Sequence, residues 1–301
     1  MYRTLVILRY TFLEAVLQPI YSLLLTLGAA ILLVFSLLPF FTLGEDTKMF
    51  KSVALDVILL LVLLATLFAT SKSIYEEIED RTMLTLMSKP VRRWEVMLGK
   101  YLGIISAAAL GVALLGLVVV LGTILRVPTD YQLNPNSLDD TIRKQIISLD
   151  LMHIAGLVPQ LVLTWLQISV LAAVGVALST RFSLVVNLPA VIILYLMGNM
   201  TRFLLPIVAG GPLAGKPAAV QWFGKAVGLI LPYLSAFDLK DVTVLSTIKV
   251  RSFASDPQAV ALTPIWTYVG LATLYAIAYC TFVLCAGMWS FQRRELGGGE
   301  G

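Results

Sequence analysis

Charged residues, histidine and cysteine, which build most catalytic and metal sites, are scarce in this chain. Only 13% of its 301 residues are charged and 58% are hydrophobic, whereas about 25% of the residues of an ordinary globular protein are charged. His153 is the only histidine, which excludes the H-E-x-x-H zinc motif and most histidine-based catalysis. A chain this apolar is unsuited to a soluble domain, and its length suits a bundle of several membrane helices.

Other familiar sources of chemistry are missing as well. Cys280 and Cys285 lie in one apolar run, so we expect them to pack in a helix and not to form a disulfide or a metal pair. No Gly-Lys pair belongs to a P-loop, the motif that cradles nucleotide phosphates. Asp56 is the only acidic residue inside an apolar run. Transporters driven by protons or sodium normally need ionisable groups or broken helices at the membrane midplane, so the energy source is expected to lie elsewhere.

Long runs without charged residues are present instead, and they predict six membrane-spanning helices. The fold class expected is an all-α membrane protein with one transmembrane domain over residues 1–301. The small net charge of +4 indicates membrane orientation and not nucleic-acid binding. The expected spans cover residues 20–41, 53–70, 101–125, 155–180, 182–204 and 264–290.

Lysine and arginine orient the predicted bundle. They concentrate at both termini, in residues 72–100 and at Arg181. Short loops rich in these residues stay in the cytoplasm. The prediction is therefore an N-in, C-in topology, with outer loops at residues 126–152 and 205–263.

Three shorter segments flank the spans. Residues 1–18 place polar side chains along one face, which predicts an amphipathic helix in the cytoplasmic membrane interface. In the first outer loop, Ser137 can cap a second amphipathic helix, which is either a lid over the helix ends or a gate. The apolar piece from Ala226 to Phe237 contains Pro232 and is too short to span, so we expect a re-entrant or interfacial outer helix.

Small residues recur at every fourth position at the start of the third span. Such a stripe lets another helix approach closely, so it predicts a helix-packing face. Its members are Gly99, Gly103, Ala107 and Gly111.

Residues 72–100 carry the densest charge of the chain, between the second and third spans. Leu84 and Met87 are apolar residues at helical spacing among the charged ones, and Ser88 and Pro90 are suited to start a new helix. One interpretation is a short cytoplasmic helix against which a soluble partner pushes. The other is an ordinary positively charged loop whose acidic residues add solubility.

Three stretches in this region carry a family resemblance. They are Glu77 to Thr82, then Leu84 to Arg93 with its Ser-Lys-Pro turn, then Leu98 to Gly103. In these stretches the chain resembles the permease subunit of type-2 ATP-binding-cassette (ABC) exporters. It is most similar to the branch named for copper-enzyme maturation and gliding motility. A looser similarity follows at Leu231 to Leu239.

The resemblance implies that this chain works with a separate ATPase. Two permease copies and two ATPase subunits would form an exporter in the bacterial inner membrane. ATP and magnesium would be bound by the ATPases, and this chain would hold no catalytic residue, cofactor or metal. A partner on the outer side of the membrane is a further expectation at the outer loops. The residues expected to contact the ATPase are Glu79, Arg81, Thr82, Leu84, Ser88, Lys89, Pro90 and Arg93.

Two other functions stay open. The chain could be an assembly or scaffold subunit of a membrane complex, without transport. A secondary transporter or membrane enzyme is the third reading, but it would need ionisable groups inside the membrane. The copper-related name of the similar branch does not imply a metal site in this chain, because one histidine, two cysteines and nine scattered methionines form no convincing copper site.

Overall fold

The fold is that of a computed structural model, which describes residues 2–38, 46–77, 92–131, 133, 139–204, 231–244, 248–249 and 260–292. Almost all of these residues are helical. The helices are α1 (Tyr2–Leu17), α2 (Pro19–Leu37), α3 (Asp46–Thr70), the π-helical turn η1 (Ser71–Glu76), α6 (Arg93–Asp130), α7 (Asp140–Ser179), α8 (Leu184–Leu204), the 3-10 turn η2 (Leu234–Phe237), α10 (Lys240–Thr243) and α11 (Leu262–Gln292). Strand β1 (Ile248–Lys249) pairs in parallel with β2 (Val260–Ala261).

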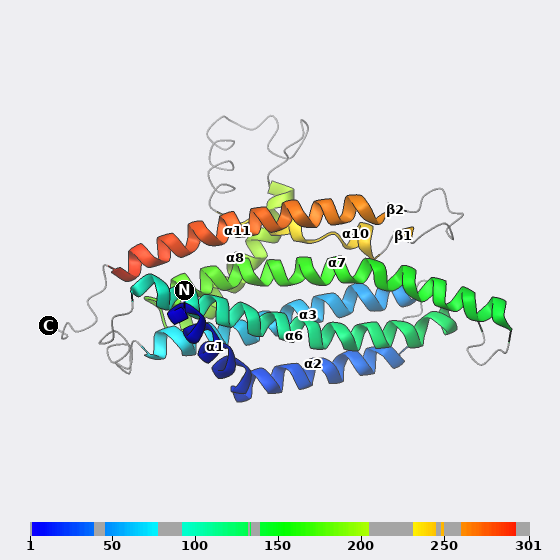
Figure 1. The fold of residues 1–301 in the computed structure, drawn as a ribbon, viewed down its shortest axis with the longest axis horizontal. Helices are drawn as coiled ribbons and strands as arrows, with labels where there is room; N and C mark the ends of the chain where they lie inside the picture. Colours follow the sequence, from blue (N-terminus) through cyan, green and yellow to red (C-terminus); the bar gives the residue numbers. More distant parts are fainter. Residues whose placement is uncertain are drawn as a thin grey trace.

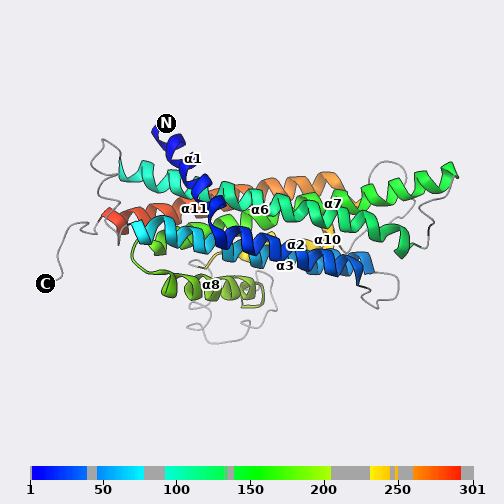
Figure 2. The same ribbon diagram turned by 90° about the horizontal axis from the view of Figure 1, so that it is seen from below.

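Five long helices, α2, α3, α6, α7 and α11, run along the longest axis of the molecule (Figure 1). The proximal end of this bundle is defined here as the end at which η1 finishes and α6 begins, and the distal end is the opposite one. α1 begins and α11 finishes at the proximal end, so both ends of the described chain lie there (Figure 1). α1 and α8 flank the long helices on opposite sides (Figure 2).

The core of the bundle is built around α3 and α7. In the most apolar stretch of each of these helices 67% of the residues are buried, against 28% in α2 and α11. α2 and α11 therefore lie on the flanks and keep wide apolar faces, with Leu33, Leu271 and Phe282 among the exposed side chains. Such faces on helices of this length are typical of contact with lipid.

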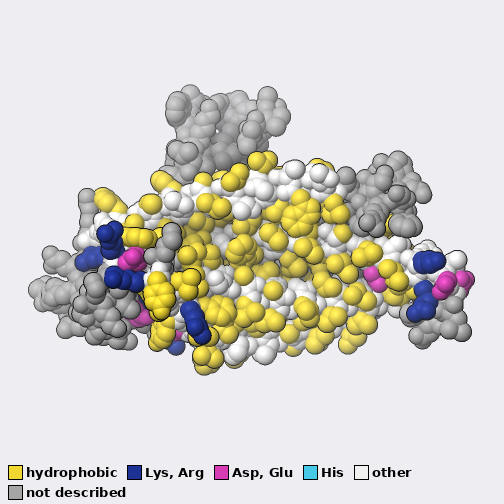
Figure 3. All heavy atoms as spheres, viewed as in Figure 1, with side chains coloured by type: hydrophobic (Ala, Val, Ile, Leu, Met, Phe, Trp, Pro, Cys, Tyr) yellow, Lys and Arg dark blue, Asp and Glu magenta, His cyan; other side chains and the backbone are white. Residues whose placement is uncertain are grey.

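The surface shows the same division (Figure 3). Hydrophobic side chains cover the middle of the visible face, and lysine, arginine and acidic side chains lie toward its two ends. Because ionised groups are costly in hydrocarbon, the apolar band marks the part of the protein that the membrane surrounds.

Within the part of the chain that the structure describes, five helices are long and apolar enough to cross a membrane: α2, α3 with η1, α6, α7 and α11. The remaining predicted span, residues 182–204, corresponds to α8, whose apolar part Leu184–Met200 is shorter. The helical membrane fold is thus confirmed, whereas the count of six spans is not.

α1 lies obliquely across the proximal part of the bundle (Figure 1). Its Thr11 is buried, whereas Tyr2, Leu5 and Tyr10 are exposed. The apolar face of α1 therefore points away from the protein, as in a helix that lies in the membrane interface.

α7 is one continuous helix of 40 residues, which joins the predicted outer amphipathic helix to the predicted fourth span. It extends beyond the other helices at the distal end (Figure 1). Asp139 caps its start by accepting hydrogen bonds from the backbone N–H and the hydroxyl of Thr141, which lower the pKa of the Asp139 carboxyl. Ser137, the cap favoured by the sequence, lies outside the described residues.

The described part of the predicted outer helix, from Leu231 to Phe237, ends in the 3-10 turn η2 and is not α-helical. Leu234 and Phe237 are fully buried. A Cβ added to Gly198 of α8 would lie 2.7 Å from Leu234 Cδ1, so the two segments are in close contact. The segment of residues 231–244 is therefore packed into the bundle.

Candidate functional site

The predicted ATPase-contact segment joins the bundle at two described points, Glu77 and the start of α6 at Arg93. The structure therefore defines the candidate site by what holds the two ends of the segment. The other predicted contact residues lie outside the described residues; they are Glu79, Arg81, Thr82, Leu84, Ser88, Lys89 and Pro90.

The first end of the segment is reached through a π-helical turn. α3 continues directly into η1, in which Ser71, Ser73 and Ile74 are buried. Turns of this kind are rare and occur often at functional sites. The chain thus leaves the bundle through an irregular but packed piece of helix.

Lys100 of α6 reaches across to this turn. The residue is buried, with 3% of its surface exposed. Its Nζ lies 2.7 Å from Glu77 Oε2 and 3.1 Å from Ser73 Oγ, and it also donates to the Ser73 carbonyl oxygen. A buried ammonium is costly unless it is paired and hydrogen-bonded, and both conditions are met here. The contacts tie the end of α3 to the start of α6.

The small-residue stripe of α6 receives α1 beside this ion pair. A Cβ added to Gly103 would lie 2.8 Å from the carbonyl oxygen of Leu8, and Gly99 faces α1 in the same way. Glu14 of α1 is near enough to Lys100 to act on its charge. α1, η1 and α6 therefore meet at one place.

Further along the stripe, α2 takes over as the neighbouring helix. The Tyr21 hydroxyl donates a hydrogen bond of 2.8 Å to the Ala107 carbonyl oxygen. A Cβ added to Gly111 would lie 3.3 Å from the same hydroxyl. All four predicted stripe residues thus lie at helix–helix contacts.

The second end of the segment is held by α11. Arg93 Nη1 donates hydrogen bonds of 3.3 Å to the carbonyl oxygens of Phe291 and Gln292. From the turn between α7 and α8, Arg181 Nε donates one of 2.7 Å to Ser290 Oγ. Cations stabilise the C-terminal end of a helix, because its last carbonyls are unpaired and partly negative. Arg93, predicted to contact an ATPase, is engaged with α11 in this structure.

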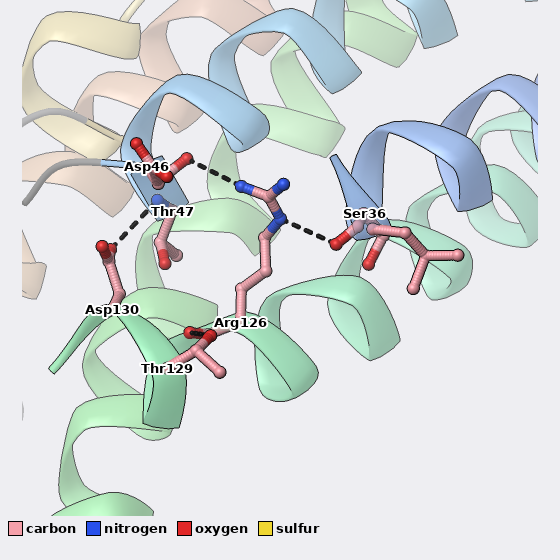
Figure 4. Close-up of a pocket in the computed structure, with 7 residues that line it drawn as sticks. Ser36, Asp46, Thr47, Arg126, Thr129 and Asp130 are labelled. Carbon is pink, nitrogen blue, oxygen red and sulfur yellow. Dashed lines mark hydrogen bonds between the residues drawn. The ribbon is translucent and has the colours of Figure 1, made fainter. Parts of the chain in front are cut away.

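A second polar site lies at the distal end, between α2, α3 and α6, and lines a cavity of about 270 Å³ (Figure 4). Arg126 Nε donates to the Ser36 carbonyl oxygen at 2.9 Å, and Nη1 to that of Asp46 at 3.4 Å. Asp130 accepts a hydrogen bond of 3.0 Å from the Thr47 backbone. The guanidinium is directed at backbone carbonyls, so this site joins helix ends and offers no reactive group.

Two charged residues of α3 bind the segment of residues 231–244. Asp56, the lone acid of the predicted span, forms an ion pair with Lys240. The buried Lys51 places Nζ 3.0 Å from His153 Nδ1 and 3.4 Å from the Val244 carbonyl oxygen. The single histidine thus takes part in packing. Within the described ranges, no group of three or more His, Cys, Asp or Glu residues is placed to hold a metal.

Gln160 of α7 fixes the same segment from the other side. Its Nε2 donates to the Phe237 carbonyl oxygen at 3.1 Å. Its Oε1 accepts from the Leu239 backbone at 3.2 Å and from Thr243 Oγ1 at 3.3 Å. One amide therefore pairs with two backbone groups of this segment, while the Thr243 hydroxyl also has the Leu239 carbonyl oxygen as an acceptor at 2.9 Å.

Comparison with known proteins identifies a membrane-transport family. A family model described as ABC-2 family transporter protein matches residues 4–296, nearly the whole chain. The chain belongs to the ABC-2 transporter family. It is accordingly a multi-pass membrane subunit of an ABC transporter, a transport subunit and not a catalytic enzyme, of a kind that works with an ATPase partner. No curated protein matches the chain.

In this ABC-2 permease, sequence reasoning missed Lys100 and Gln160 as organising residues. Lys100 enters the sequence prediction as a positive charge on the cytoplasmic side and as one residue of the stretch from Leu98 to Gly103 that carries the resemblance. A signal for it was available, because a lysine at the start of a membrane helix directly after Gly99 must either reach the interface or be paired. The partners of Gln160 are far away in the sequence, and no local pattern points to them.

Proposed function

We propose that this ABC-2 permease is the transmembrane subunit of an exporter that moves cargo outward as a separate ATPase hydrolyses ATP. Two permeases and two ATPases would form the working unit in the bacterial inner membrane, with the cargo path between the permeases. ATP and magnesium would be held by the ATPases. The resemblance of residues 77–103 to the copper-enzyme-maturation and gliding-motility branch supports this assignment.

The observation that carries the proposal is the attachment of the charged segment at both ends. Glu77 is paired with the buried Lys100, and Arg93 is bound to the end of α11. Packed elements transmit displacement as rigid bodies, whereas a loop whose ends make no contacts with the helices would absorb it. A soluble partner that pushes on residues 78–91 would therefore move α3, α6 and α11.

The contact itself would be made by charged side chains in the segment. Arginine is suited to this role because its planar guanidinium pairs with carboxylates through two hydrogen bonds. Arg93 would support the contact from the bundle side. The proposed coupling element consists of Glu79, Arg81, Thr82 and Leu84, and the turn beside it of Ser88, Lys89, Pro90 and Arg93.

The test is purification in mild detergent after co-expression with the neighbouring genes. We expect an ATPase in equal amount with the permease. Arg81→Glu should lower the recovered ATPase at least tenfold, because it places like charges at the contact. Arg143→Glu, at an exposed position of α7, is the matched control. Full recovery with Arg81→Glu would show that the contact lies elsewhere.

The same purification tests two further parts of the proposal. A permease that elutes as a dimer supports the paired arrangement. A partner from the outer side of the membrane is proposed because α7 extends beyond the other helices and exposes Ile147 and Leu151. A chain that purifies without any ATPase, but with another membrane protein, would favour an assembly subunit instead.

A further inference from the structure

We infer that Lys100 is a positioning residue that makes η1, α1 and α6 move together when the charged segment is displaced. The inference rests on the proposed function and deepens it. It names the group through which the displacement of a cytoplasmic segment would reach the membrane helices.

The first step of the argument is the hydrogen-bonding capacity of the lysine. An ammonium group has three N–H donors and no acceptor. The Lys100 ammonium has three acceptors: Glu77 Oε2, Ser73 Oγ and the Ser73 carbonyl oxygen. All three belong to η1 and the residue that directly follows it, while the lysine belongs to α6. All three N–H groups of the Lys100 ammonium therefore have acceptors on the neighbouring element, and these contacts join the two elements.

The second step is the burial of the ammonium group. The Lys100 side chain is 4% exposed, whereas that of its partner Glu77 is 24% exposed, so the cationic end of the pair is the one that the protein encloses. The void beside Lys100 is lined by Ile74, Val96, Met97 and Phe291. A buried charge is screened less by solvent and salt than an exposed one. The Lys100 end of the ion pair is therefore less screened than the lysine of a surface salt bridge.

The third step is the position of α1. Gly99, the residue before Lys100, and Gly103, one turn further on, allow α1 to lie directly on α6. Glu14 of α1 adds a second carboxylate within electrostatic reach of the same ammonium. A movement of η1 that pulls on Lys100 is thereby passed to α1 as well as to α6.

Packing alone does not explain a lysine at this position. When both partners of a buried ion pair are replaced by apolar residues of similar volume, stability is often unchanged or raised, so filling this space does not require a lysine. What the ion pair adds is a fixed register between two elements, because its hydrogen bonds are satisfied in one arrangement only. A coupling role requires such a fixed register.

The experiment uses the full permease bound to its ATPase in lipid nanodiscs. Cys280 and Cys285 are replaced by serine, and spin labels are placed at Tyr10 of α1 and Leu274 of α11, which are 70% and 65% exposed. The distance between the labels is measured without nucleotide and with ATP and vanadate. Complex recovery and ATP hydrolysis are measured on the same samples.

The wild-type complex should show a nucleotide-dependent change of this distance. Lys100→Met should leave the complex assembled and hydrolysing ATP but reduce the change at least threefold. Lys100→Arg should keep most of the change, and the exchanged pair Lys100→Glu with Glu77→Lys should restore at least half of it. Lys144→Met, at an exposed position of α7, is the control and should behave as the wild type.

The outcomes separate the two proposals. Failure to recover an ATPase with the wild-type chain overturns the proposed function. If the complex forms and the distance change is absent in the wild type or intact in Lys100→Met, only the positioning role of Lys100 is overturned. Should Lys100→Met fail to fold, the exchanged pair decides, because a folded exchange variant that does not restore the change also overturns it.

Discussion

Arg126 shows how a single side chain organises the distal end of this permease. It is largely buried, and it donates to the carbonyl oxygens of Phe35 and Ser36 in the last turn of α2. Its guanidinium also lies 5.1 Å from the ring centre of Phe50 of α3. The side chain therefore satisfies the unpaired end of one helix while it packs on another.

Replacing this arginine should destabilise the protein without touching the proximal site. We expect Arg126→Met to lower the free energy of unfolding by about 3 kcal/mol, because several charge-assisted hydrogen bonds are lost and carbonyls are left unpaired. Thermal unfolding in detergent measures the effect. Arg143→Met, on the exposed face of α7, is the matched control. Equal unfolding temperatures for the two variants would contradict the assigned role.

At the same scale, the sequence reveals some roles and conceals others. The stripe that begins at Gly99 could be recognised because helix periodicity alone places its members on one face. The partners of Arg93 and Asp56 could not, because Phe291 and Lys240 lie far from them in the sequence. Charge predicts that a residue needs a partner, but only the fold determines which one.

Among the helices, the packing of α1 against α6 gives the clearest prediction. A side chain at Gly103 would approach the Leu8 carbonyl oxygen to 2.8 Å, whereas a Cβ at Gly270 of α11 would meet nothing within 4 Å. Gly103→Val should therefore push α1 away from α6 at a cost of about 1–3 kcal/mol. Gly270→Val is its matched control.

Hydrogen exchange of the α1 amides measures the displacement. We expect exchange at least tenfold faster in Gly103→Val and unchanged in Gly270→Val, because a helix that loses its packing opens more often. Equal protection in both variants would show that α1 is held in place by the membrane and not by α6.

The segment of residues 231–244 depends on Gln160 in a comparable way. Gln160→Leu keeps the size of the side chain but leaves the Phe237 carbonyl and the Leu239 N–H without their partner. Exchange of the Leu239 amide should become faster by at least tenfold. Gln145→Leu, on the exposed part of α7, should leave it unchanged. An unchanged rate in Gln160→Leu would mean that apolar packing of Phe237 is sufficient.

For the elements, each long apolar run of the sequence lies in a helix of the structure, and five of these helices are long and apolar enough to cross a membrane within the described residues. Hydropathy did not predict that α7 would be continuous from Asp140 to Ser179. The polar residues in the first part of that helix indicated a separate amphipathic helix. The helix continues through this change in composition and through Pro159, which hydropathy does not report.

For the whole molecule, the orientation in the membrane is the main prediction from charge. Single cysteines at Thr85 and Asp140, in a chain whose own cysteines are replaced by serine, should be labelled from opposite sides. A thiol reagent that cannot cross the membrane makes this measurement in intact cells. Thr85→Cys should react only after the cells are opened, and Asp140→Cys should react before. Labelling of both from one side would refute the proposed topology.

The length of α7 has a mechanical consequence. At about 1.5 Å per residue its 40 residues form a rod of roughly 60 Å, about twice the thickness of the hydrocarbon core. Were this helix, which contains Pro159, to tilt as one unit about its proximal end, a tilt of about ten degrees would move its far tip through roughly 10 Å. Small angular changes at the proximal end would then become large displacements at the distal end.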